Sequence, residues 1–226
     1  MLSKLNIRKI HRYLGVFIGI QFMMWTISGL YFSWTDIDEI HGDHFLNDSE
    51  IIDSFNNLKP FDQPNMDINS LELLSVAGKP YYWVNQNTLY DAITGNSKDE
   101  ISEEEARKVI SKLLKEDLEI IKVEKIFEVG SHHEYRGRPL PAYAIHLDHP
   151  ENLVAYIDAK SGKFQRVRHR NWRWFDFLWM THTMDYQGRD DFNNILLRIF
   201  SVFGLFAVLS GFLLWFITSK TIRRFF

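Results

Sequence analysis

The chain contains no cysteine among its 226 residues. It therefore cannot form a disulfide, use a thiolate nucleophile or hold an iron–sulfur cluster with its own side chains. An oxidising compartment permits disulfides but does not require them, so the missing cysteines leave the cellular location open.

Other common signatures are also missing. The sequence shows no nucleophile–base arrangement, no glycine-rich phosphate loop and no dinucleotide-binding fingerprint. The formal net charge is -3, from 26 basic and 29 acidic residues, which argues against nucleic acid as the main partner. The nine histidines are therefore the main candidates for chemistry in this chain.

Two long apolar runs are the strongest positive feature of the sequence. They cover residues 14–34 and 195–217, and their few polar interruptions include Gln21, Ser28 and Ser210. Each run has the length of about 20 residues that an α-helix needs to cross about 30 Å of hydrocarbon. We therefore expect two transmembrane helices with a polar domain between them.

Basic residues lie outside both runs, in segments 1–13 and 218–226. The positive-inside rule then places both termini in the cytoplasm and the central domain on the other side of the membrane. A cleaved signal peptide is an alternative for the first run, but the run exceeds the usual 7–15 apolar residues and lacks a clear cleavage site. Two buried helices of a soluble protein are another alternative, against which the flanking charges argue.

The central segment shows the pattern of an α+β domain. Residues 102–105 (SEEE) form a capping box, and apolar residues at helical spacing then predict an amphipathic helix that ends near residue 117. Strands are expected at 81–84, 88–90, 119–129, 141–147, 153–157 and 164–167.

A short turn motif occurs twice in this domain. DAITG at 91–95 and DAKSG at 158–162 each follow a strand pair, which indicates two related helix-plus-sheet units, the first of them degenerate. The aspartate and hydroxyl residues suit the turn and the glycine takes a positive φ, so we assign the motif a structural role.

Several segments together form a pattern known from one family. They are RKIHRYLG (8–15), WTISGLY (25–31), the capped helix with YIDAKSG (156–162), and WMTHTMDY (179–186) followed by Arg189 and FN (192–193). On these segments the chain resembles small bacterial membrane proteins with a PepSY domain and PepSY-associated transmembrane helices. The resemblance covers nearly the whole chain apart from residues 48–69.

The resemblance implies a two-pass protein of the bacterial inner membrane with a periplasmic central domain. The expected organisation is a basic N-terminus (1–13), a first span (14–34), a degenerate PepSY-like unit with a connector (35–97), a PepSY-like domain (98–168), an interfacial aromatic helix with a connector (169–194), a second span (195–217) and a basic tail (218–226). Larger four-span relatives reduce siderophore-bound iron with haem held by histidines. The PepSY module also resembles a propeptide domain that restrains secreted proteases.

His11 lies just before the first run, at the expected cytoplasmic face. Neutral imidazole is a good haem ligand, and electron-transfer haems commonly take two. Because the second run has no histidine, such a haem needs a second His11 from a homodimer partner or another subunit. Alternatively, His11 joins Arg8 and Arg12 in a basic cluster that contacts lipid headgroups.

A second histidine group is expected at the outer face, where His41 and His44 follow the first run and His182 precedes the second. Arg198 would pair with a nearby aspartate or contact a haem propionate. We predict that His182 approaches His44 in an aromatic site suited to haem b, unless it is only hydrogen-bonded to Asp185 or backbone. An amphipathic helix is predicted here, with one face carrying Trp172, Phe175, Trp179, His182 and Tyr186.

The remaining polar groups leave metal ligands unassigned. The histidines at 132, 133, 146 and 149 form either a transition-metal patch or ordinary solvated loops. Arg136 and Arg138 suit a carboxylate or phosphate and, with the neighbouring prolines, suggest a docking edge.

Three functions are compatible with these features. The leading interpretation is an accessory protein of iron or haem handling, with His182, His44, His11 and Arg198 as haem-binding residues of a reductase subunit that works as an oligomer. The rival is a non-catalytic module that binds a periplasmic protein or inhibits a protease. The third is a structural subunit of a larger membrane complex; membrane lipid is an expected partner of all three.

Overall fold

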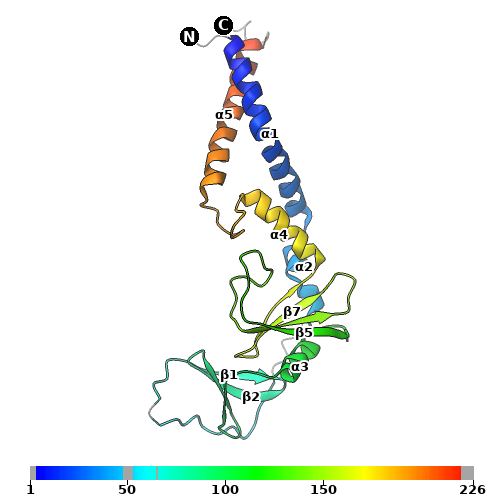
Figure 1. Ribbon diagram of the computed structural model, residues 1–226, viewed down its shortest axis with the longest axis vertical. Coiled ribbons are helices and arrows are strands. Elements are labelled where there is room, and N and C mark those ends of the chain that lie inside the picture. Colours follow the sequence, from blue (N-terminus) through cyan, green and yellow to red (C-terminus); the bar gives the residue numbers. More distant parts are fainter. Residues whose placement is uncertain (1–3, 48–52, 65, 220–226) are drawn as a thin grey trace. The chain divides into compact units, whose positions relative to one another are not determined.

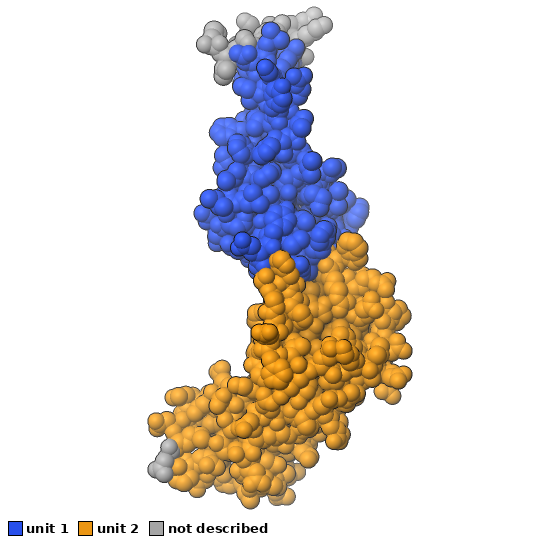
Figure 2. All heavy atoms as spheres, in the orientation of Figure 1, with its two compact units in different colours: residues 1–35, 175–226 blue, residues 36–174 orange. Residues whose placement is uncertain are grey.

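The computed structural model describes residues 4–47, 53–64 and 66–219 (Figure 1). The chain divides into two compact units, coloured separately in Figure 2. Residues 1–35 with 175–226 form one, here named the helical unit, and residues 36–174 form the other, the sheet unit. Most of the predicted basic tail, 220–226, lies outside the described residues.

The helical unit contains both predicted spans. Helix α1 covers Lys4–Trp34 and helix α5 covers Ile195–Thr218, and both are long and apolar enough to cross a membrane. Helix α1 begins before the predicted span because the basic segment ahead of the apolar run lacks proline and glycine and is helical too.

The two long helices pack side by side (Figure 1). The rings of Phe17 and Phe200 stack with centroids 5.6 Å apart. Gly204 lets the helices approach closely, since a Cβ there would lie 3.0 Å from the ring of Phe22. A glycine facing an aromatic ring is a common way to pack helices in a bilayer.

Helix α4, Arg170–Thr183, contains the boundary between the units. Within the helical unit its last turns pack on α1, where Phe32 contacts the rings of Phe175 and Trp179 at 4.8 and 5.7 Å. The helix ends at Thr183 because Met184 takes a positive φ of 55°. The predicted continuation of the helical face to Tyr186 is therefore wrong.

A compact turn joins α4 to α5. The carboxylate of Asp185 accepts hydrogen bonds from the backbone N–H groups of Gln187, Gly188 and Asp191 at 3.1, 3.0 and 2.9 Å. Asn194 then caps α5 by accepting from the N–H of Leu197 at 2.8 Å.

The sheet unit contains two four-stranded antiparallel sheets, in the orders β1-β2-β3-β4 and β5-β6-β7-β8. Two short helices precede them, α2 (Ile37–His41) and η1 (Asp43–Phe45), and α3 (Glu103–Leu113) lies between them in the chain. The strands are β1 (Leu71–Val76), β2 (Lys79–Val84), β3 (Thr88–Asp91), β4 (Ser97–Lys98), β5 (Ile120–Ile126), β6 (Ala142–Leu147), β7 (Val154–Asp158) and β8 (Phe164–Arg168). The predicted α+β fold is confirmed.

The repeated turn motif has the same hydrogen bonds in both sheets. Ala92 donates its N–H to the carbonyl of Pro80, and Ala159 does so to Pro141, both at 3.0 Å. Each first aspartate accepts N–H groups two and three residues later, and each glycine has a positive φ. The likeness thus extends to the proline that begins each central hairpin, which supports two related units.

Helix α3 has the predicted capping box, in which Ser102 accepts from the N–H of Glu105 and Glu105 accepts from the N–H of Ser102. It ends at Leu113, earlier than predicted, because Leu114 is extended and pairs with Leu46. Its apolar face joins the core formed by both sheets, which includes Leu89, Ile110, Ile145 and Ile157.

Candidate functional site

His11 lies on α1 with its ring turned towards α5. Its Nδ1 is 2.8 Å from the hydroxyl of Ser210. The ring fits against Gly211, where an added Cβ would lie 3.2 Å from His11 Cε1. An apolar groove of about 440 Å³ also borders Gly211, between side chains of α5. The His11 ring therefore packs between α1 and α5, and its role as a haem ligand or as part of a basic cluster stays a prediction.

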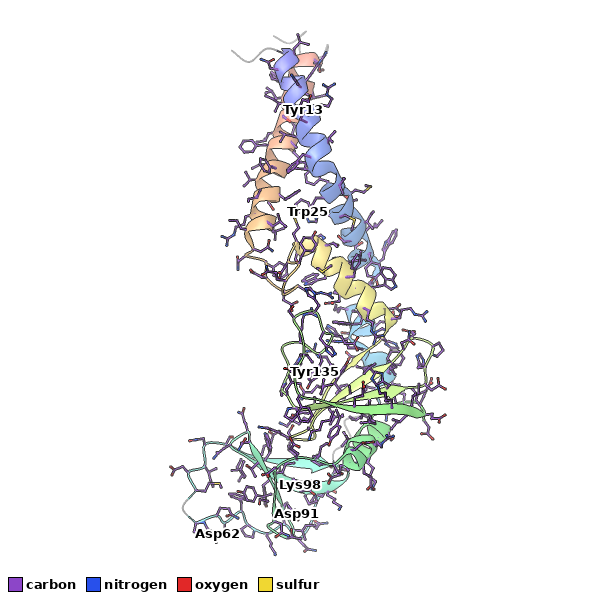
Figure 3. All side chains as sticks on the ribbon, in the orientation of Figure 1. Tyr13, Trp25, Asp62, Asp91, Lys98 and Tyr135 are labelled. Atoms are coloured by element: carbon purple, nitrogen blue, oxygen red, sulfur yellow. The ribbon has the colours of Figure 1, made fainter. Side chains whose placement is uncertain are left out.

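His182 lies near the end of α4 and contacts the C-terminal half of α1. Its Nδ1 is 2.7 Å from the hydroxyl of Ser28, a fully buried residue. Its backbone carbonyl accepts from Trp25, labelled in Figure 3, at 2.8 Å, and Phe32 covers its ring at 5.6 Å. Burial lowers the pKa of His182, which favours the neutral imidazole.

We assign the same tautomer to both histidines from the hydrogen bonds that the two serines make within their own helices. Ser210 donates its single hydroxyl hydrogen to the carbonyl of Ala207 at 2.7 Å, and Ser28 donates to that of Met24 at 2.7 Å. Each serine oxygen is then left to accept a proton from imidazole Nδ1. The Nε2 atoms of His11 and His182 keep their lone pairs, which is the form that binds a metal.

His44 belongs to the sheet unit, where it is exposed. Its ring lies 3.9 Å from that of Phe45 and 5.5 Å from that of His169. His169 is buried and fully used, with Nδ1 at 2.8 Å from Glu151 and Nε2 at 3.1 Å from a backbone carbonyl. The predicted approach of His182 to His44 joins two units and stays a prediction.

His41 lies in a small exposed cluster with Asp38 and Asp43, whose ligand atoms are within 4.8 Å of one another. The histidines at 132, 133, 146 and 149, for which a transition-metal patch or solvated loops were expected, include two that make separate contacts. His146 lies 3.2 Å from Glu124, and His133 Nδ1 accepts the N–H of Tyr135.

Arg198 lies in the first turn of α5 and is exposed. Its guanidinium donates to the side-chain oxygen of Asn193 at 3.5 Å. The carboxylate of Asp185 is instead occupied by backbone N–H groups, and Arg189 pairs with Asp176.

Sequence reasoning missed the roles of Ser28, Ser210 and Gly211. The available signal was that both serines interrupt long apolar runs, where a polar residue usually has a function or a partner. Their histidine partners are 154 and 199 residues away in the sequence, so local patterns could not pair them.

The fold and these helices define a membrane protein in which apolar helices near the two ends of the chain flank a central α+β domain. The chain belongs to the PepSY-associated TM region family, whose model matches residues 8–226. The predicted resemblance is thereby confirmed. No curated protein and no solved structure gives a significant match.

Proposed function

We propose that this protein serves iron or haem handling in the bacterial inner membrane by transferring electrons through haem b held between two copies of the chain. Reduction of a ferric siderophore is the reaction class proposed for such an oligomer. In this orientation both termini are cytoplasmic and the central domain is periplasmic, as the flanking basic residues favour.

The observation that carries the proposal is the matched pair of serine–histidine contacts. His11 and His182 each have Nδ1 within hydrogen-bond distance of a serine hydroxyl, and in the tautomer that we assign Nε2 keeps its lone pair. A structural histidine needs no such match, but a haem ligand benefits from a partner that fixes its tautomer and ring orientation.

The two histidines lie at different heights along α1, which we call the His11 level and the His182 level. His11 and Ser28, the partner of His182, are 17 residues apart on α1, or about 25 Å along its axis. One chain therefore supplies one of these ligands at each level. A second copy would complete both bis-histidine pairs, which is why the proposal requires a dimer or larger complex.

The residues present fit a haem at each level. Haem supplies one-electron redox chemistry when it is bound between two histidines. His11 and His182 would supply the iron ligands, Gly211 leaves room for the His11 ring, and Phe32 and Trp179 supply apolar walls near His182. Arg198 and His44 are assigned to the propionates and the outer site only as proposals.

The absorption spectrum of the purified, detergent-solubilised protein tests the proposal. Wild type is expected to show a Soret band, and His182→Ala and His11→Ala are each expected to lose about half of the bound haem, because each removes one of two levels. His146→Ala is the matched control, since His146 pairs with Glu124 on the sheet unit. A wild-type protein without a Soret band would defeat the redox function.

A second candidate, a module that binds a periplasmic protein, is favoured by the edge strand β1. Its residues Leu71 and Leu73 are 48% and 45% exposed, and one side of the strand is unpaired in its sheet. Such an edge can accept a strand from a partner. This function predicts that Leu73→Lys abolishes partner binding while the His11 and His182 variants retain it.

A further inference from the structure

A basic pocket lies along the edge strand β8 of the sheet unit. It has a volume of about 320 Å³ and is bordered by β8, the segment from α2 to η1, the loop before β6 and the start of α4. We name it the β8 pocket. Its polar and aromatic lining includes Arg138, Arg166, Arg168, His41, Asp43 and Trp172.

Strand alternation places two of the arginines on one face of the sheet. Arg166 pairs with Tyr156 and Arg168 pairs with Val154, and the register shifts just before these pairs. Val167, between the two arginines, points into the main core and is 1% exposed. By alternation Arg166 and Arg168 share the opposite face.

Arg168 is held rigidly in the wall of the pocket. It is 5% exposed, its guanidinium carbon lies 3.8 Å from the ring centroid of Trp172, and its Nε donates to the carbonyl of Glu134 at 3.2 Å. The carboxylate of Glu134 already pairs with Arg173, so it does not serve as the main counter-charge of the pocket.

Arg166 and Arg138 have unused donors. The Nε of Arg166 is buried and has no acceptor among the described residues. Arg138 is exposed and makes no hydrogen bond or ion pair with the part of the chain that the structure describes. Buried guanidinium N–H groups normally have an acceptor, so Arg166 points to one supplied from outside the chain.

We propose that the β8 pocket binds the phosphate group of a small molecule or of a lipid. Three arginines and the carboxylate of Asp43 line the pocket, and the carboxylate of Asp38 lies beside Asp43 and His41, so positive charge is in excess. A phosphate monoester is negatively charged at neutral pH, and guanidinium forks match its oxygens. The site is separate from the residues of the redox proposal and does not depend on it.

Calorimetric titration of the full-length protein in a nonionic detergent tests this site, with sodium phosphate and short-chain dioctanoyl phosphatidic acid as separate probes. Wild type is expected to bind at least one of them. Arg166→Gln and Arg138→Gln should each weaken binding about tenfold, because each removes a charge-assisted hydrogen-bond donor. Binding of both probes indicates a free phosphate site, and binding of phosphatidic acid alone indicates a lipid headgroup.

Arg107→Gln is the matched control, since it removes the same charge from an exposed position on α3 where Arg107 pairs with Glu103. Arg138 is exposed, so its variant should fold even where Arg166→Gln does not. The proposal is overturned when wild type binds neither probe, or when Arg138→Gln and the control bind as wild type does.

Discussion

Two serine hydroxyls lie within hydrogen-bond distance of Nδ1 of His11 and of His182. At Ser28 the hydroxyl is fully buried and lies 2.7 Å from His182 Nδ1. We expect Ser28→Ala to lower the haem affinity of the His182 level by about 10- to 100-fold, as is usual when the partner of a ligand histidine is lost. Haem titration of the apoprotein measures this. Ser33→Ala is the control, because Ser33 is exposed and bonds only within its own helix; equal affinities would remove the role given to Ser28.

Gly211 makes space for the other histidine. A Cβ at this position would lie 3.2 Å from His11 Cε1, so Gly211→Ala should push the ring away from Ser210. We expect a loss of the haem bound at the His11 level with the His182 level unchanged, read from the haem-to-protein ratio. Gly19→Ala is the matched control, since an added Cβ there meets nothing within 4 Å. A full complement of haem in Gly211→Ala would contradict this arrangement.

At the scale of elements, the repeated turn should matter differently in the two sheets. Asp158 is buried and binds the N–H groups of Lys160 and Ser161, whereas Asp91 is half-buried and binds those of Ile93 and Thr94. Removing the acceptor leaves N–H groups unpaired, and this costs more stability when they are buried. Asp158→Ala should therefore lower the free energy of unfolding by about 2–3 kcal/mol and Asp91→Ala by about 1 kcal/mol. Urea denaturation measures both, and the reverse order would count against the packing described.

The turn between α4 and α5 should be sensitive to acid. Burial alone would raise the pKa of Asp185, but backbone N–H groups of residues 187–191 outweigh it and hold the pKa below its ordinary value. The stabilisation is therefore complete above the unfolded-state pKa of about 4 and is lost as the pH falls through the lower folded-state value. Asp185→Asn should destabilise by about 1–2 kcal/mol at pH 7.

Thermal unfolding of wild type and Asp185→Asn in detergent, measured from neutral to acidic pH, checks this expectation. The difference in unfolding temperature between wild type and Asp185→Asn should become smaller below about pH 4. The exposed Asp99 provides the control substitution, Asp99→Asn, which should follow wild type at every pH. If the difference in unfolding temperature stays constant across the acid range, the stability of the turn does not depend on the charge of Asp185.

The sequence predicted those elements whose signals are local. The two apolar runs, the Ser102 capping box and the Asp-to-Gly turns all lie within one window of the chain. Contacts between distant segments gave no such local signal, as for Ser28 with His182 and for His11 with Ser210. The two-residue strand β4 was also missed, because two residues carry no alternation to detect.

At the scale of the whole molecule, the proposed function couples haem binding to oligomerisation, because each haem takes one histidine from each of two chains. We expect haem-loaded protein to run as a dimer or larger complex and the His11→Ala, His182→Ala double variant to run as a monomer, because each chain supplies only one of these histidines per level. Size-exclusion chromatography with light scattering gives the masses. Haem-loaded monomers would instead require both ligands from one chain.

Helix α1 contacts its two neighbours, α4 and α5, through different stripes of side chains. The angle between the two stripes is set by the number of helical residues between them. His11, Phe17 and Phe22 form the first stripe, which contacts α5, while Trp25, Ser28 and Phe32 form the second stripe, which contacts α4. One residue inserted after Met24 would advance the second stripe by about 100° and leave the first unchanged. The number of residues between His11 and Ser28 thus fixes the direction of the His182 contacts relative to the His11 contacts. Substitutions between these two positions should be tolerated more readily than insertions or deletions.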